Sequence, residues 1–286
     1  MRSNPRYLDR VPVRLGLFAA ALALVFGVAA AVGAAVHPGQ PAAVCGSMHG
    51  MSHETLGLSV TQDGTTIAPA SFAASPGARQ LLRFRVLGSD GAPLRSGYQI
   101  EAQRRLHLIV VRRDLTGYQH LHPRMSANGT WSVPLRVSEP GAYRVFADFQ
   151  LRCDKHVLAG DLLVPGSFRP TALPAASPVA SADGYDVQLA SPVVRAGHEA
   201  QLRFTVSRHG RPVHALERYL GARGHLVALR QGDLAYLHVH PESHRDAANA
   251  IPFAAEFPSA GSYRLFLQFQ IADVVRTTAF TVEVAP

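Results

Sequence analysis

The sequence predicts an all-β protein made of two tandem β-sandwich domains. Three observations support this fold class: a long internal repeat, short apolar runs separated by turn signals, and a tyrosine that follows a glycine turn at the same place in each repeat. Helical periodicity of useful length occurs only in one apolar run near the N-terminus. The 286 residues are enough for two ordinary domains, and 47% of them are hydrophobic, as a packed core requires.

The internal repeat appears when the chain is compared with itself. Three stretches recur 118 to 120 residues later: LRFRV (82–86) as LRFTV (202–206), HLIVVRRDLTGYQHLHP (107–123) as HLVALRQGDLAYLHVHP (225–241), and PGAYRVFADFQ (140–150) as AGSYRLFLQFQ (260–270). Short loop insertions account for the small change in offset. The chain therefore contains two homologous domains.

The predicted organisation has six segments. They are a cytoplasmic tip at 1–14, a transmembrane anchor or signal sequence at 15–36, a Met- and His-containing tether at 37–54, a first domain at 55–168, a linker at 169–182 and a second domain at 183–286. The linker is assigned because Pro, Ala and Ser dominate this region without hydrophobic periodicity.

Turn dipeptides divide each domain into short strands rich in Val, Leu, Phe and Tyr. The turn signals are Asp63-Gly64, Asp90-Gly91, Asn128-Gly129 and Gly160-Asp161 in the first domain, and His209-Gly210 and Gly232-Asp233 in the second. Strands at this spacing indicate an all-β sandwich.

Tyr143 and Tyr263 each follow a glycine turn and precede the final strands, HVLAGDLLV and RTTAFTVEV. A tyrosine corner at this position is typical of an immunoglobulin-like sandwich. An ordinary buried tyrosine after a turn is the alternative for either site alone.

The N-terminal segment predicts a membrane location. Residues 15–36, LGLFAAALALVFGVAAAVGAAV, are uncharged and mostly apolar. At about 1.5 Å per residue they can cross a hydrocarbon core of about 30 Å. Four arginines precede this run, so a single-pass protein with its domains outside the cytoplasm is favoured. A cleaved signal peptide, which would give a secreted protein, is the alternative because the run ends in small residues.

Charge and cysteine content narrow the expected partners. The formal net charge of +8 forms no basic run, so no nucleic-acid partner is expected. Cys45 and Cys153 have no CxxC spacing, although a disulfide would be chemically compatible with an extracytoplasmic location. Lys155 is the only lysine beside 27 arginines, which we attribute to coding bias.

The strongest chemical signal is a histidine pattern, H-x12-H-x-H-P, that occurs once in each domain. Its members are His107, His120 and His122 in the first domain and His225, His238 and His240 in the second.

Strand geometry predicts that each trio converges. The two halves of 107–123 should form an antiparallel hairpin in which paired residue numbers sum to about 229. His107 would then lie opposite His122, and His120 would share their face. The equivalent sum in the second domain is 465. Three neutral imidazoles suit Cu(II) or Zn(II). Histidines that only hydrogen-bond carbonyl groups and fix the hairpin are the alternative.

A second cluster lies in the tether sequence CGSMHGMSH, with Met48, His49, Met51 and His53 as candidate ligands. Soft thioether ligands select Cu(I), and the flanking Gly and Ser residues would allow the segment to wrap an ion. A polar tether without metal affinity is the alternative.

These features favour a non-enzymatic protein of the cell envelope that binds copper or zinc for storage, delivery or tolerance. A structural adaptor that presents its sandwiches to another envelope protein is the second hypothesis. An enzyme is not expected because the sequence has neither GxSxG nor HExxH.

The predicted hairpin sequence HLIVVRRDLTGYQHLHP (107–123) and its repeat at 225–241 resemble sequences of a family of bacterial secreted or membrane-anchored proteins. This family is described as heavy-metal-associated or YtkA-like. The resemblance covers both domains and implies two small extracytoplasmic β-sandwich modules of the cupredoxin/YtkA-like kind. Relatives often carry another histidine five residues before the position of His107, where this chain has Ala102, with Leu220 at the second site. The resemblance therefore implies fold and location more than a complete metal site.

Overall fold

The computed structural model describes residues 16–27, 56–69, 71–190, 193–237, 239–242 and 250–286. Residues 16–27 form a helix with exposed side chains. Within the part of the chain that is described, no helix has the length and hydropathy needed to cross a membrane. The rest of the predicted anchor and the whole predicted tether lie outside the described residues, so both stay predictions.

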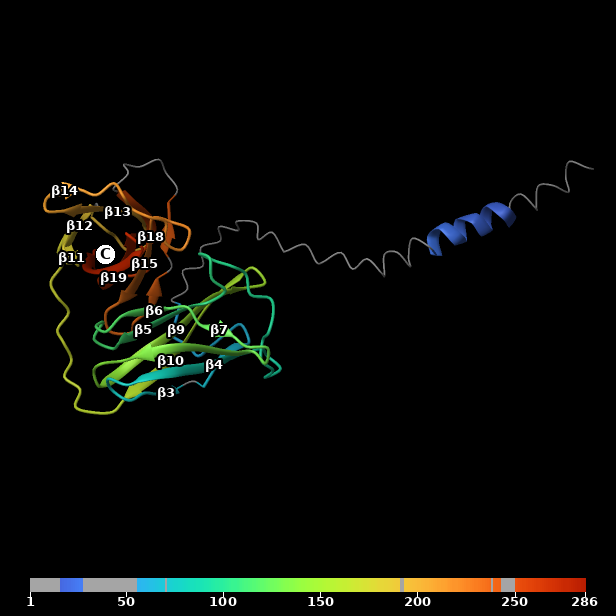
Figure 1. The fold of residues 1–286 in the computed structure, drawn as a ribbon, viewed down its shortest axis with the longest axis horizontal. Helices are drawn as coiled ribbons and strands as arrows, with labels where there is room; N and C mark the ends of the chain where they lie inside the picture. The colour runs from blue at the N-terminus through green and yellow to red at the C-terminus, as the bar shows by residue number, and fades with distance from the viewer. Residues whose placement is uncertain (1–15, 28–55, 70, 191–192, 238, 243–249) are drawn as a thin grey trace, which may run out of the picture. The chain divides into compact units, whose positions relative to one another are not determined.

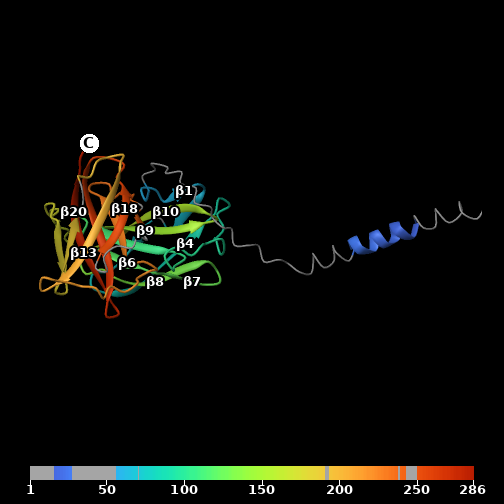
Figure 2. The same cartoon turned by 90° about the horizontal axis from the view of Figure 1, so that it is seen from above.

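The first repeat folds as a β-sandwich, the N-terminal sandwich (Figures 1 and 2). One sheet has the order β1-β2-β4-β8-β7, with strands β1 (Thr61–Gln62), β2 (Thr65–Ala68), β4 (Arg79–Leu87), β8 (Thr130–Arg136) and β7 (Arg124–Met125). The other sheet has the order β3-β10-β9-β5-β6, with strands β3 (Ser71–Ala73), β10 (Asp154–Val164), β9 (Gly141–Leu151), β5 (His107–Arg112) and β6 (Gln119–Leu121).

The second repeat folds in the same way, as the C-terminal sandwich. One sheet has the order β11-β12-β13-β18-β17, with β14 also on β13; the strands are β11 (Val179–Ala182), β12 (Tyr185–Ala190), β13 (Glu199–Arg208), β18 (Ala250–Glu256), β17 (Val239–Pro241) and β14 (Arg211–Pro212). The other has the order β16-β15-β19-β20, with strands β16 (Tyr236–Leu237), β15 (Gly224–Arg230), β19 (Gly261–Ile271) and β20 (Val274–Val284). The predicted all-β fold with two repeated domains is confirmed.

The structure corrects two local predictions. Strand β11 lies inside the predicted linker, so the C-terminal sandwich begins at Val179. Its sequence, VASA, lacks the apolar alternation that predicts a strand, but a turn with positive φ at Asp183 and Gly184 pairs it with β12. The predicted turn at Gly160-Asp161 lies inside β10 instead, paired with β9.

Both tyrosine corners are confirmed. The Tyr143 hydroxyl donates to the carbonyl of Glu139 at 2.8 Å, and the Tyr263 hydroxyl donates to the carbonyl of Ser259 at 3.0 Å. Each bond closes back over four residues, as a tyrosine corner requires.

The two sandwiches pack against each other through a shared apolar layer. Side chains alternate along β5, so Leu108 and Val110 face the core of their own sandwich, while Ile109 and Val111 face outward. The outward side chains join a separate buried cluster that includes residues from both repeats: Phe146, Val157, Val227, Leu229, Leu234, Tyr236 and Phe266. All six residues of β5 are consequently buried.

Equivalent residues of the two repeats meet across this layer. Tyr118 stacks on Phe266 with ring centroids 4.1 Å apart, and the equivalent pair, Tyr236 and Phe146, has centroids 5.5 Å apart. The sandwiches therefore pack with an approximate two-fold relation, as the subunits of a symmetric dimer do.

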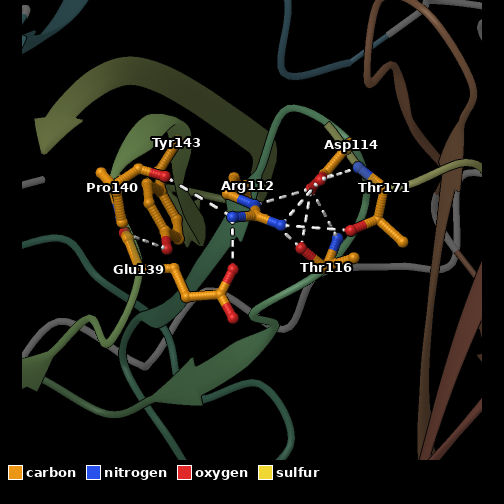
Figure 3. Close-up of polar contacts among 7 residues, drawn as sticks. All are labelled: Arg112, Asp114, Thr116, Glu139, Pro140, Tyr143 and Thr171. Atoms are coloured by element: carbon orange, nitrogen blue, oxygen red, sulfur yellow. Dashed lines mark hydrogen bonds and ion pairs between the residues drawn. The ribbon is translucent and has the colours of Figure 1, made fainter. Parts of the chain in front are cut away.

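A polar cluster around Arg112 joins the β5–β6 turn to the chain that leaves the N-terminal sandwich. Figure 3 shows the guanidinium between Asp114 and Glu139. Its Nε donates to Asp114 at 2.9 Å and its Nη1 to Glu139 at 2.5 Å, while Asp114 accepts the backbone N–H of Thr171 at 2.8 Å. This turn therefore has a fixed position relative to the start of the linker.

Candidate metal centre

The predicted hairpin registers are both confirmed. Leu108 pairs with Leu121 and Ile109 with His120, which gives the predicted sum of 229. Ala228 pairs with Leu237, which gives the predicted sum of 465. His107 and His120 consequently lie on the outward face of the N-terminal sandwich.

Four histidine rings gather where the two sandwiches meet. The ring centroid of His107 lies 5.1 Å from that of His120, 5.3 Å from that of His122 and 5.4 Å from that of His225. The centroid of His120 lies 4.7 Å from His122 and 4.5 Å from His225. The predicted trio of the first domain converges, and the second domain contributes His225 to the same place.

Three of these rings lie close enough together that they could hold a metal ion. Ligand nitrogens of His107, His120 and His225 all lie within 4.8 Å of one another. His122 adjoins the group. We refer to these four residues as the histidine cluster.

Hydrogen bonds on the far sides of two rings determine which nitrogens face the centre. His107 donates through Nε2 to the carbonyl of Glu101 at 3.0 Å. His120 Nδ1 lies 2.6 Å from Oε1 of Gln268, whose amide nitrogen donates to Thr277 at 3.3 Å. A carbonyl oxygen only accepts, so with the amide placed in this way His120 donates through Nδ1.

The two remaining nitrogens point at each other as lone pairs. Nδ1 of His107 and Nε2 of His120 lie 2.9 Å apart. A neutral imidazole carries one proton, and in both rings that proton is already used in the bond to a carbonyl oxygen. Two facing lone pairs repel unless a proton or a metal ion lies between them.

Two further ring nitrogens are buried without a hydrogen bond. They are Nδ1 of His225 and Nε2 of His122, neither of which has a partner among the described residues. A buried polar atom left in this way costs about 1–3 kcal/mol. Coordination of an ion would satisfy such an atom.

Burial keeps the rings of the histidine cluster neutral, which is the form that binds metals. Burial lowers the pKa of His122 to about 4 and the pKa of His225 to about 3. Burial also lowers the pKa of His107, partly offset by the charge of Asp148, and lowers the pKa of His120 well below its usual value, together with the neighbouring histidines.

A chain of charged groups borders the cluster. Asp148 pairs with His107 across β5 and β9. Its carboxylate lies 2.5 Å from the Lys155 ammonium and accepts the Tyr236 hydroxyl at 2.9 Å, and Lys155 also binds Glu101 at 2.6 Å. Although burial lowers the pKa of Lys155, the two carboxylates outweigh this effect and raise it.

A cavity of about 650 Å³ opens beside the cluster. Its lining includes His107 and His225 together with residues of both sandwiches. Ala102 and Leu220 also line this cavity.

The structure does not pair His240 with His225 as predicted. The backbone of His240 belongs to β17, in the other sheet, where it pairs with Ala254. His238, Met48, His49, Met51 and His53 lie outside the described residues. Their role as ligands stays a prediction.

Sequence reasoning did not identify several residues around the cluster: Glu101, Asp148, Lys155, Tyr236 and Gln268. One sequence feature could have predicted that the two sandwiches meet at this place. The run HLIVVR is apolar without alternation, which indicates a strand covered on both faces. Since both repeats carry such a strand, mutual covering of the two hairpins was a predictable arrangement.

Cys153 is disulfide-bonded. Cys45, the other cysteine of the sequence, lies outside the described residues.

Fold and site together define a two-module β-sandwich protein with a histidine cluster between its modules. The chain belongs to the family described as Domain of unknown function (DUF8832), which matches residues 59–165 and 180–286. The two matches correspond to the two sandwiches. Among curated proteins the chain has no match.

Similar solved structures have low identity. A DUF4426 family protein from Pseudomonas aeruginosa PAO1 is 12% identical with a TM-score of 0.29, over 38% of this chain and 96% of that protein. A Salmonella alpha-2-macroglobulin is 13% identical with a TM-score of 0.28, over 79% of this chain and 15% of that protein. The Escherichia coli adhesin FdeC is 13% identical with a TM-score of 0.26, over 79% and 65%.

Proposed function

We propose that this protein binds one transition-metal ion in the histidine cluster between its two sandwiches. The observation that carries the proposal is the 2.9 Å approach of Nδ1 of His107 and Nε2 of His120, which face each other as lone pairs when Gln268 presents its oxygen to His120. The protons on the far nitrogens bind carbonyl oxygens, which is the arrangement that orients histidine ligands in metal sites. His225 supplies the third nitrogen, and His122 is the nearest additional ligand.

The same distance favours Cu(II) over Zn(II). Two nitrogens at about 2.0–2.1 Å from one ion are about 2.9 Å apart at a right angle and about 3.4 Å apart at the tetrahedral angle. Cu(II) prefers square-planar or tetragonal sites, whereas Zn(II) is usually tetrahedral. The spacing of His107 and His120 fits the former.

The wider role rests on the sequence. We place the two modules, which we assign to the immunoglobulin-like, YtkA-like class, outside the cytoplasm on a membrane anchor. In this setting the protein would store, deliver or detoxify copper, and the Met and His residues of the tether would capture Cu(I). The proposal includes no enzymatic step.

One observation favours a purely structural role. His107 and His120 each bind a carbonyl oxygen, which is how histidines that only fix a hairpin behave. Rotating the Gln268 amide by 180° would let His120 donate to His107 and satisfy the pair without an ion. Metal binding decides between the two roles.

The test uses the purified full-length chain and its His107→Ala/His120→Ala variant, titrated with Cu(II) in a calorimeter and analysed for bound metal. The variant should bind one equivalent less than the wild type. His214→Ala is the matched control because His214 is exposed and is not a member of the histidine cluster. Equal stoichiometry in all three proteins would refute the proposal.

A further inference from the structure

Two of the four residues of the histidine cluster line the cavity beside it. His107 and His225 line it, whereas His120 and His122 do not. An ion held by these histidines would therefore lie next to the cavity. Metal sites with three protein ligands generally keep a further position for water or an added ligand.

The two walls of the cavity differ in chemistry. The wall from the N-terminal sandwich carries Glu101, Asp148 and Lys155, which bind one another. The wall from the C-terminal sandwich is mixed: Leu220, Leu226 and Phe253 form an apolar part of it, and Arg218, Arg223 and Glu242 also line the cavity.

The size of the cavity suits a small organic molecule. Its volume of about 650 Å³ lies within the range of about 300–1,000 Å³ that is usual for such sites. Apolar residues combined with convergent polar groups are also typical of them. Since Glu101, Asp148 and Lys155 already bind one another, we expect the ion and the apolar part of the C-terminal wall to contact a ligand.

We propose that the cavity binds a small amphipathic molecule, which coordinates the ion through one nitrogen or oxygen donor and packs an apolar group against the C-terminal sandwich. This inference rests on the proposed metal site. It makes the centre an open one, at which the ion exchanges ligands, rather than a closed structural site.

The experiment titrates the Cu(II)-loaded full-length chain with imidazole and with 4-phenylimidazole, followed by electron paramagnetic resonance and visible absorption. Both probes should change the copper spectrum. 4-Phenylimidazole should bind about tenfold more tightly or better, because its phenyl ring leaves water for the apolar part of the C-terminal wall. The metal-free chain should bind neither probe.

Ala222→Trp tests the place of binding, with Ala222→Ser as its matched control, because Ala222 lines the cavity and is not a proposed ligand. The tryptophan variant should load copper normally and lose the preference for 4-phenylimidazole, while the serine variant keeps it. If the tryptophan variant fails to fold, the titrations of the wild type with the two probes still test whether the cavity binds a ligand of the ion.

The outcomes separate the two proposals. Copper that loads but shows no spectral change with either probe would overturn the open site and leave the metal site standing. Equal affinity for the two probes, or binding of a probe without copper, would contradict the proposal that one molecule coordinates the ion and also packs against the apolar residues. Failure to load copper would overturn both.

Discussion

The two sandwiches share a repeated sequence but use its hairpin differently. In the N-terminal sandwich β6 stays beside β5 through Leu121, so His120 remains on the outward face. In the C-terminal sandwich pairing with β15 stops at Leu237, and the chain after residue 238 pairs with β18. Among the described side chains, the first repeat contributes three histidines to the cluster and the second repeat contributes His225.

The residues opposite the first histidine of each pattern also differ. His107 pairs with Asp148, and His225 pairs with Gln268. The carboxylate binds Lys155 and Tyr236, whereas the amide binds His120 of the other sandwich. The two repeats thus differ at one equivalent position: Asp148 contributes to the charged wall of the cavity, whereas Gln268 orients the ligand His120.

The largest expected difference concerns the equivalent arginines. Arg112 and Asp114 side chains are 5% and 4% exposed, whereas those of Arg230 and Asp233 are 24% and 40% exposed. Arg112→Met should cost about 3–5 kcal/mol of unfolding free energy, because it leaves a buried charge unpaired. Arg230→Met should cost about 1 kcal/mol or less. Urea denaturation measures the unfolding free energy of both variants. Equal losses of stability would contradict a difference between the two arginines.

The next expected effect is on metal affinity. His225→Ala should weaken Cu(II) binding by about 100-fold or more, on the order of 3 kcal/mol, since it removes a ligand supplied by the opposite sandwich. Calorimetric titration beside His214→Ala measures the change. Unchanged affinity would mean that the N-terminal trio binds the ion without the second repeat.

A smaller effect is expected at Gln268. Gln268→Met removes the acceptor for His120 and should weaken Cu(II) binding about 10- to 100-fold, the usual effect of removing a residue that orients a ligand. Gln268→Glu keeps an acceptor and should retain the affinity. If both variants bind copper as the wild type does, the amide does not orient His120.

The smallest effect is the acid stability of the metal-free chain. His122 and His225 have a folded pKa of about 4 and about 3, below the ordinary value of 6.5. Above pH 6.5 both states are neutral, and the contribution to stability is complete. As the pH falls from 6.5 toward these values, the unfolded chain binds protons that the folded chain excludes, so stability decreases.

Urea denaturation at pH 6.5 and pH 4.5, above most carboxylate titrations, should show a loss of at least about 1 kcal/mol. His122→Gln should reduce this loss. A midpoint that does not move between the two pH values would contradict a neutral, buried cluster.

The sequence predicted what local chemistry determines. Hairpin registers follow from strand pairing within a few residues, and both sums, 229 and 465, are observed. The tyrosine corners follow from a turn and one side chain, and both are observed.

It did not predict what depends on packing between distant segments. The approach of His225 to His107 requires the outward faces of two sheets to meet, and spacing within one hairpin contains no information about that contact. The end of pairing at Leu237 was missed for a similar reason, because β18 competes for the same strand from the other sheet. Gly160 resembled a turn residue but pairs within β10, where neighbouring strands override its local preference.

The most direct test of the central claim is the stoichiometry of Cu(II) bound to the full-length chain and to the His107→Ala/His120→Ala variant. We predict that the variant binds one equivalent of Cu(II) less than the wild type. We also predict that the copper signal of the wild type shows coupling to nitrogen ligands by electron paramagnetic resonance. Identical stoichiometry, or a copper spectrum without nitrogen coupling, would contradict a metal ion between the two sandwiches.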